Sequence, residues 1–140
     1  MTQSPDATRT LTIERVLPHP PEKVWRALTE VPLLDQWLLE SDFKPVVGHT
    51  FNFRNPPMPQ WDGLVHGEVL TVEPPQRLAY RWAALGLDSV VTWTLTPTEG
   101  GTHLRMEQAG FAPEHGQAYA GAKAGWNHRL DTLSGLLAQA

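Results

Sequence analysis

An α+β fold, in which a curved antiparallel sheet of about six strands wraps around a long C-terminal helix, is predicted by three features of the sequence. Two short segments with helical spacing follow the first strand, alternating segments separated by turns fill the middle, and a long amphipathic segment ends the chain. A sheet with one apolar face needs a cover, which the terminal helix can supply. Residues 1–8 are polar and contain the breaker Ser4-Pro5-Asp6, so we expect a disordered tail there. No repeat or linker divides the rest of the chain, so we expect a single domain over residues 9–140.

Length and composition limit the classes of protein. A chain of 140 residues forms one ordinary domain, and the absence of cysteine excludes disulfides, thiolate metal sites and cysteine nucleophiles. The formal net charge of −4 argues against nucleic acid or an anionic membrane as the partner. The first residues lack the apolar core of a signal peptide, and no apolar run approaches the roughly 20 residues of a membrane span. We therefore expect a soluble, cytoplasmic protein that is a monomer or a weak homodimer.

The N-terminal part of the chain predicts one strand and two short helices. Three groups of apolar residues mark them in order: Leu11, Ile13, Val16 and Leu17, then Val24, Trp25 and Leu28, then Leu33, Leu34, Trp37 and Leu38. Proline is favoured in the first turn of a helix, so the first helix begins at the prolines that precede Glu22. The same helix is expected to end before Pro32, because the residue before a proline avoids the helical conformation.

Apolar–polar alternation predicts strands over five further segments: residues 50–54, 64–73, 78–82, 90–96 and 102–108. Tight turns between the later segments favour an antiparallel meander. Residues 55–60 contain three prolines, so this segment cannot pair inside a sheet. Residues 114–138 are predicted to form the long helix, and its apolar stripe consists of Ala118, Ala122, Trp126, Leu130, Leu133 and Leu137.

A series of short motifs runs through nearly the whole chain. The motifs are Arg15 with Pro20-Pro21-Glu22-Lys23-Val24-Trp25 and Leu28-Thr29, Gln36-Trp37, the 48–53 segment, Asp62-Gly63, Gly67-Glu68-Val69, Pro74-Pro75 with Leu78, Tyr80 and Trp82, the 91–97 segment, Gly101-Thr102 with Leu104, Gly110-Phe111, and Gly125-Trp126 with Leu130 and Leu133. In this order they resemble the START-like (SRPBCC, helix-grip) superfamily and, within it, the family named for the activator of the heat-shock-protein-90 ATPase. The resemblance implies a helix-grip fold, which hosts chaperone-binding domains, lipid carriers, cyclases and hydrolases. Two positions depart from the family pattern: Gln108 stands where many relatives have a histidine, and Leu38 where many have a second tryptophan.

No pattern of catalytic residues is found in the sequence, and we expect no cofactor. None of the serines stands in a Gly-x-Ser-x-Gly elbow, and no phosphate-binding loop is present. His66 and Glu68 share one strand face, as do His103, Arg105 and Glu107. If the two strands were neighbours, two histidines and a carboxylate could hold a metal ion. We interpret both faces as ordinary solvated surface instead and predict no metal site.

The surplus of aromatic residues indicates an apolar cavity. A long helix laid across a curved sheet leaves space between them, and ligand pockets are mostly apolar with a few polar groups. Trp126 on the helix and Trp93 on the sheet are the expected walls. The full set of predicted lining residues is Trp126, Trp93, Trp82, Tyr80, Phe51, Phe53, Trp61, Met58, Met106 and Ala122, with Arg54, Asp62 and His66 as candidate polar groups.

Three functions remain open on these grounds. The first is non-catalytic binding of a small hydrophobic or amphipathic molecule, the second a cyclase- or hydrolase-like enzyme using the same cavity, and the third a module that binds a chaperone or regulatory protein. Inward-facing His66, Asp62 or Glu68 would favour the enzyme, and a contiguous exposed apolar patch above about 400 Å² would favour the module. We interpret the 55–60 loop as a lid over the cavity, with Met58 as its flexible apolar residue.

Overall fold

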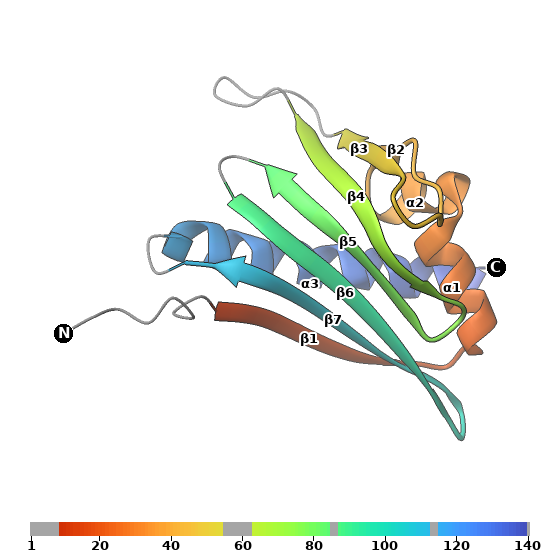
Figure 1. Cartoon of the computed structure of the whole chain (residues 1–140). Helices are drawn as coiled ribbons and strands as arrows, with labels where there is room; N and C mark the ends of the chain where they lie inside the picture. Colours follow the sequence, from red (N-terminus) through yellow and green to blue (C-terminus); the bar gives the residue numbers. More distant parts are fainter. Residues whose placement is uncertain (1–8, 55–62, 85–86, 113–114, 140) are drawn as a thin grey trace.

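The structure, a computed structural model, describes residues 9–54, 63–84, 87–112 and 115–139. Its elements follow in chain order: β1 (Arg9–Leu17), α1 (Pro21–Thr29), α2 (Val31–Trp37), β2 (Glu40–Ser41), β3 (Thr50–Arg54), β4 (Leu64–Glu73), β5 (Arg77–Ala84), β6 (Leu87–Thr98), β7 (Gly101–Phe111) and α3 (Gly116–Gln139). The long helix α3 crosses one face of a curved sheet, and α1 and α2 lie near its C-terminal end (Figure 1). The predicted α+β architecture is confirmed, and the predicted tail lies outside the described residues.

The sheet contains seven antiparallel strands in the order β1-β7-β6-β5-β4-β3-β2. Strands β3 to β7 form the expected meander, and the first strand joins it by pairing with the last. The strand β2 accounts for the difference from the predicted six strands. It has two residues and pairs with β3 through Glu40 and Arg54. Two residues are too few to show an alternating pattern, so the sequence carries no signal for this strand.

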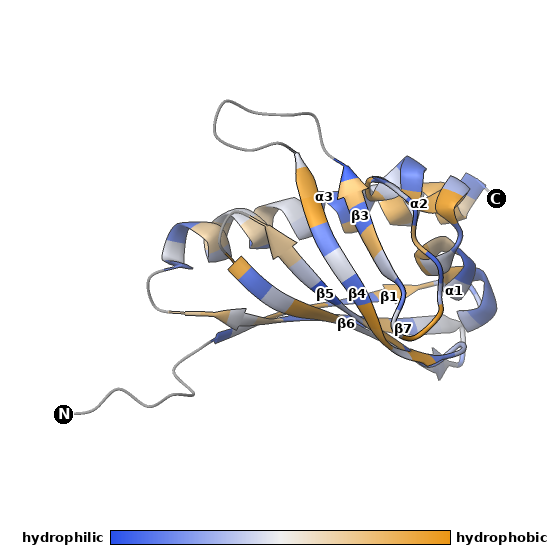
Figure 2. Ribbon diagram, turned by 45° about the horizontal axis from the view of Figure 1, so that its top comes forward, coloured by the Kyte–Doolittle hydropathy of each residue, from blue (hydrophilic) through white to orange (hydrophobic). Residues whose placement is uncertain are grey.

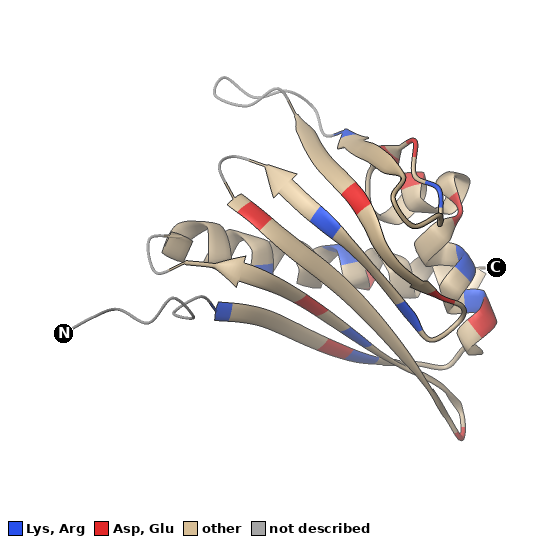
Figure 3. Ribbon diagram, viewed as in Figure 1, with Lys and Arg blue, Asp and Glu red and all other residues tan. Residues whose placement is uncertain are grey.

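Strand β7 shows how the sequence defines the two faces of the sheet. Leu104 and Met106 are buried under the helices, whereas the alternating residues His103, Arg105 and Glu107 lie on the opposite, partly exposed face. A similar alternation of buried and more exposed positions runs along β3, the first part of β4 and most of β6, and apolar and polar bands alternate along β4 in Figure 2. Charged residues are found along most of the strands, and only a few lie on α3 (Figure 3). The apolar face of the sheet is therefore the one that α3 covers.

The two short helices are joined by a single residue between Thr29 and Val31. As predicted, α1 ends before Pro32, which lies in the first turn of α2, where a missing N–H costs no hydrogen bond. The indole Nε1 of Trp37 donates a 2.7 Å hydrogen bond to the carbonyl of Ala27, which ties α2 to α1. Among the described residues, no helix combines the length and the apolar character needed to cross a membrane.

Candidate ligand cavity

A cavity of about 360 Å³ lies between the sheet and the first half of α3. Its wall is formed by Leu39, by sheet residues Val65, Trp82, Ala84, Leu87 and Gln108, and, on and just before the helix, by His115, Ala118, Gly121, Ala122, Gly125, Trp126 and Arg129. Most of these side chains are apolar. The polar ones are Gln108, His115 and Arg129, so the cavity combines an apolar wall with a few polar groups, as ligand sites do.

Small residues on α3 create this space. Gly121 and Gly125 are one helical turn apart, and Ala118 and Ala122 lie on the same side of the helix. A Cβ atom added at Gly121 or Gly125 would meet no other atom within 4 Å. The glycines therefore do not allow a close approach of another element. They border open space that larger side chains would occupy.

A chain of buried hydrogen bonds runs along one side of the cavity. The Nε1 of Trp126 donates to Oε1 of Gln108 at 2.8 Å, and Nε2 of Gln108 donates to Oγ of Ser89 at 2.9 Å. The Ser89 hydroxyl then donates to the carbonyl of Trp82 at 2.7 Å. An indole N–H can only donate, so the amide of Gln108 must turn its oxygen to Trp126 and its nitrogen to Ser89. This network fixes the orientation of Trp126 on the cavity wall.

Among the described residues that line the cavity, Arg129 is the one lysine or arginine. Its Nη1 donates a hydrogen bond to the carbonyl of Leu38, beside the wall residue Leu39. Burial lowers the pKa of the Arg129 guanidinium from its usual value, because desolvation disfavours the charged form. Arginine nevertheless keeps its charge in proteins.

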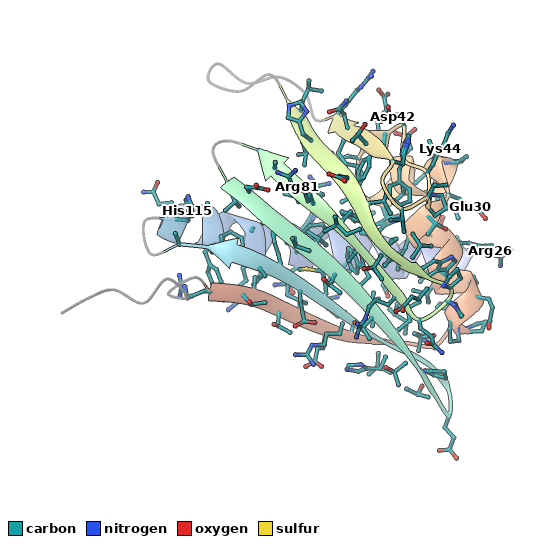
Figure 4. All side chains as sticks on the ribbon, in the orientation of Figure 1. Arg26, Glu30, Asp42, Lys44, Arg81 and His115 are labelled. Carbon is teal, nitrogen blue, oxygen red and sulfur yellow. The ribbon has the colours of Figure 1, made fainter. Side chains whose placement is uncertain are left out.

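His115 lies at the start of α3, at the other end of the wall (Figure 4). Its Nδ1 accepts a 3.0 Å hydrogen bond from the backbone N–H of Ala112. In the neutral ring, the remaining proton must then sit on Nε2, which makes this atom a donor.

Three of the predicted lining residues, Trp82, Trp126 and Ala122, lie on the cavity wall. Five others, Trp93, Tyr80, Phe51, Phe53 and Met106, lie in the packed core beside the cavity instead, each at most 3% exposed. Trp61, Met58, Asp62 and the predicted 55–60 lid lie outside the described residues.

The core aromatic residues fill space because they pack edge against face. The ring of Trp93 lies 5.5 Å from that of Trp126 and 5.8 Å from that of Trp37, centroid to centroid. Its indole Nε1 donates to the Tyr80 hydroxyl at 2.9 Å. Burial raises the pKa of that hydroxyl, so Tyr80 stays neutral. Aromatic residues in the sequence therefore indicated the apolar layer correctly, but most of them stabilise the core next to the cavity.

The two described candidate polar groups lie away from the cavity. The Nδ1 of His66 lies 2.8 Å from Oδ1 of Asn52, and Arg54 is exposed, with its Nη1 3.8 Å from a carboxylate oxygen of Glu40. Glu68 is near Arg81, which Figure 4 shows on the sheet face opposite to α3. Neither His66 nor Glu68 faces the helix, so the positions of these two residues do not favour the enzyme hypothesis.

The two-histidine arrangement considered from the sequence does not form. His66 lies on β4 and His103 on β7, and two strands separate them in the sheet. With a spacing of about 4.8 Å between strands, the backbones are roughly 14 Å apart. His103 Nε2 instead lies 3.2 Å from a carboxylate oxygen of Glu14. In the described ranges, no group of three or more His, Cys, Asp or Glu side chains is arranged to hold a metal ion.

The comparisons with known proteins agree with this fold. Residues 18–138 match the family described as Activator of Hsp90 ATPase homolog 1-like protein. The chain belongs to this family. The match confirms the resemblance drawn from the motifs, including the START-like architecture. No curated protein matches the chain.

Several solved structures share the fold over most of the chain. Protein MLL2253 from Mesorhizobium loti is 49% identical, with a TM-score of 0.89 over 94% of this chain and 98% of that one. CalU16 from Micromonospora echinospora is 27% identical, with a TM-score of 0.79 over 93% of this chain and 76% of that one. DynU16, described as a protein of the dynemicin biosynthetic locus, is 28% identical, with a TM-score of 0.79 over 95% of this chain and 48% of that one.

Proposed function

We propose that the protein binds a small hydrophobic or amphipathic molecule in the cavity between the sheet and the first half of α3, as a binding protein rather than an enzyme. The observation that carries this proposal is the apolar hollow that Gly121 and Gly125 line together with Trp82 and Trp126. The hollow opens to solvent on the helix side, where Gly121 is exposed, so a guest can enter it. A helix that keeps glycines over open space, at a cost of up to about 1 kcal/mol each, leaves room for a guest.

The size and composition of the cavity support a small guest. Its volume of about 360 Å³ lies at the lower end of the roughly 300–1,000 Å³ that is typical of ligand pockets. Trp82 and Trp126 provide flat apolar surface for an aromatic or aliphatic body. DynU16 belongs to a biosynthetic locus by its description, which is consistent with a small molecule as the partner of this fold.

A protein-binding role has less support in the described residues. The large apolar side chains that are exposed there are Val16, Val46, Val47 and Leu70. Val16 lies on the edge strand β1, and Leu70 lies on β4, with β7, β6 and β5 between them. Val16 is therefore apart from Leu70. Val46 and Val47 lie near Leu70, because the N–H of Gly48 donates to the carbonyl of Val69, so these three side chains form a small group rather than the extensive patch that marks a protein interface.

The proposal is tested by titration with a neutral apolar fluorescent probe, phenylnaphthylamine, on the wild type and two matched leucine variants. Gly125→Leu fills the cavity, whereas Gly135→Leu places the same side chain on the same helix away from the wall. We expect Gly125→Leu to weaken probe binding by at least about tenfold, because its side chain occupies the site. We expect Gly135→Leu to bind as the wild type does.

If both variants fold and bind the probe with equal affinity, the probe binds outside the cavity and the proposal is overturned. Native mass spectrometry of protein purified without denaturation complements the titration. A copurified small molecule that is retained by the wild type and lost in Gly125→Leu would identify the ligand class directly.

A further inference from the structure

Arg129 is a partly buried cation without an acidic partner among the described residues. Two other arginines pair closely with carboxylates: Nη1 of Arg15 lies 2.8 Å from Asp131, and Nη2 of Arg81 lies 2.8 Å from Asp88. The only protein acceptor that the described residues offer Arg129 is the carbonyl of Leu38, bonded to Nη1. Its pKa is lowered by desolvation alone, with no acidic group acting against it. No buried side-chain nitrogen among the described residues lacks a partner, so the remaining donors of this guanidinium are accessible on the cavity wall, where a guest can reach them.

The polar side chains that the described residues contribute to the cavity wall all have donors to offer. His115 presents Nε2–H, because its Nδ1 is occupied by the Ala112 N–H. The oxygen of Gln108 accepts from Trp126, and its amide nitrogen has a second hydrogen beyond the one given to Ser89. No acidic side chain is among the described residues that line the cavity. Such a wall favours a guest with acceptor atoms.

The donors are separated along the cavity by an apolar stretch. His115 and Arg129 are fourteen positions apart, which corresponds to about 20 Å along the helix. The wall residues between them on α3 are alanine, glycine and tryptophan. A guest that satisfies this wall has an apolar body and its charge at one end, next to Arg129.

Resting on the proposed function, we propose that the ligand is an amphipathic carboxylate whose apolar body lies along Gly121, Gly125 and Trp126 and whose carboxylate is bound by Arg129. A planar guanidinium matches a carboxylate with two parallel hydrogen bonds, and one negative charge neutralises the cation that Arg129 places on the wall. The ligand anion takes the place of the acidic partner that Arg15 and Arg81 find within the protein.

The test compares two probes of nearly identical shape, naphthylacetate and its neutral amide, naphthylacetamide, by isothermal titration calorimetry. We expect the wild type to bind the carboxylate at least about tenfold more tightly than the amide, the factor expected of a charge-assisted hydrogen bond. In Arg129→Gln this ratio should fall to about one. Arg105→Gln is the matched control: it removes the same charge from an exposed position on the opposite sheet face, and the ratio should stay unchanged.

Each other outcome has a definite meaning. Equal affinity of the wild type for both probes would overturn the role of Arg129 and leave the proposed function standing. Binding of neither probe, together with no binding of phenylnaphthylamine, would overturn both proposals. Arg129→Gln could fail to fold because it loses the contact with Leu38. In that case the two probes are compared on the wild type and on Arg129→Lys. Lysine keeps the charge, so this variant should still bind the carboxylate more tightly than the amide.

Discussion

The two halves of α3 belong to one helix but differ in how deeply their side chains are buried. Residues 116–125 contain three glycines and no buried side chain, and they border the cavity. The second half buries Trp126, Leu130, Leu133 and Leu137, which recur every three or four residues and pack on the core. Most helical stability in proteins comes from such packing. The second half therefore holds the helix on the sheet through buried side chains, whereas the first half contacts the core through partly buried ones, such as Tyr119 against Phe111, and covers the cavity.

Trp126 is the residue at which the two halves meet, and its removal should have the largest effect. Trp126→Ala is expected to lower the free energy of unfolding by about 3–5 kcal/mol. The ring is 4% exposed, contacts Trp82 and Trp93, and donates its N–H to Gln108. Chemical denaturation measures this change. A loss below about 1 kcal/mol would mean that the ring does not anchor the helix.

Leu133 tests the packed half directly. Leu133→Ala is expected to cost about 2–5 kcal/mol, because its side chain is fully buried and the substitution leaves a void. The matched substitution in the first half is Gln117→Ala, at an exposed position, which should change stability by no more than about 0.5 kcal/mol. Similar losses at both positions, measured by denaturant unfolding, would contradict the division of α3 into two halves.

Gln108 tests whether the sheet holds the junction through hydrogen bonds. Gln108→Leu keeps the size of the side chain but leaves the Trp126 N–H without its acceptor, so we expect a loss of about 1–3 kcal/mol. The tryptophan emission should shift as well, because Trp126 loses its fixed orientation. A variant as stable as the wild type would show that the network does not hold the ring.

The glycines of the first half should produce the smallest effect, in the opposite direction. Gly121→Ala is expected to raise the free energy of unfolding by up to about 1 kcal/mol, because alanine is the better helix former and its Cβ meets no atom within 4 Å. Gly135→Ala, which is equally unobstructed, should give the same gain. Thermal unfolding of both variants measures this, and a loss of stability in Gly121→Ala alone would mean that the space is not open.

Most of the fold could be predicted from the sequence because its signals are local. The strand Leu64–Glu73 was predicted with the bounds that the structure gives it, and the end of α1 followed from Pro32. The apolar stripe of α3 ended in Leu130, Leu133 and Leu137, all of which are buried. The pairing of β1 with β7 joins segments at opposite ends of the chain, and no local pattern encodes such a pairing.

The cavity wall was harder to predict, because composition does not show which aromatic rings face an empty space. Tyr80, Trp93 and Trp82 are all aromatic residues on neighbouring strands. Tyr80 and Trp93, however, are hydrogen-bonded to each other, and the Trp93 ring packs edge-on against Trp126, so both lie in the core and not on the cavity wall. The polar groups Gln108, His115 and Arg129 were not selected from the sequence. For Arg129 a signal existed: it follows Trp126 by three positions and Gly125 by four, so it lies on the same side of the helix.

Amide hydrogen exchange along α3, with and without phenylnaphthylamine, tests the division of the helix most directly. In the free protein, amides of residues 116–125 should exchange faster than those of residues 126–139, because the first half lacks buried side chains. The probe should slow exchange in the first half and leave the second half unchanged, since it fills the cavity beneath the glycines. Uniform exchange along α3, or protection by the probe confined to the second half, would contradict the account.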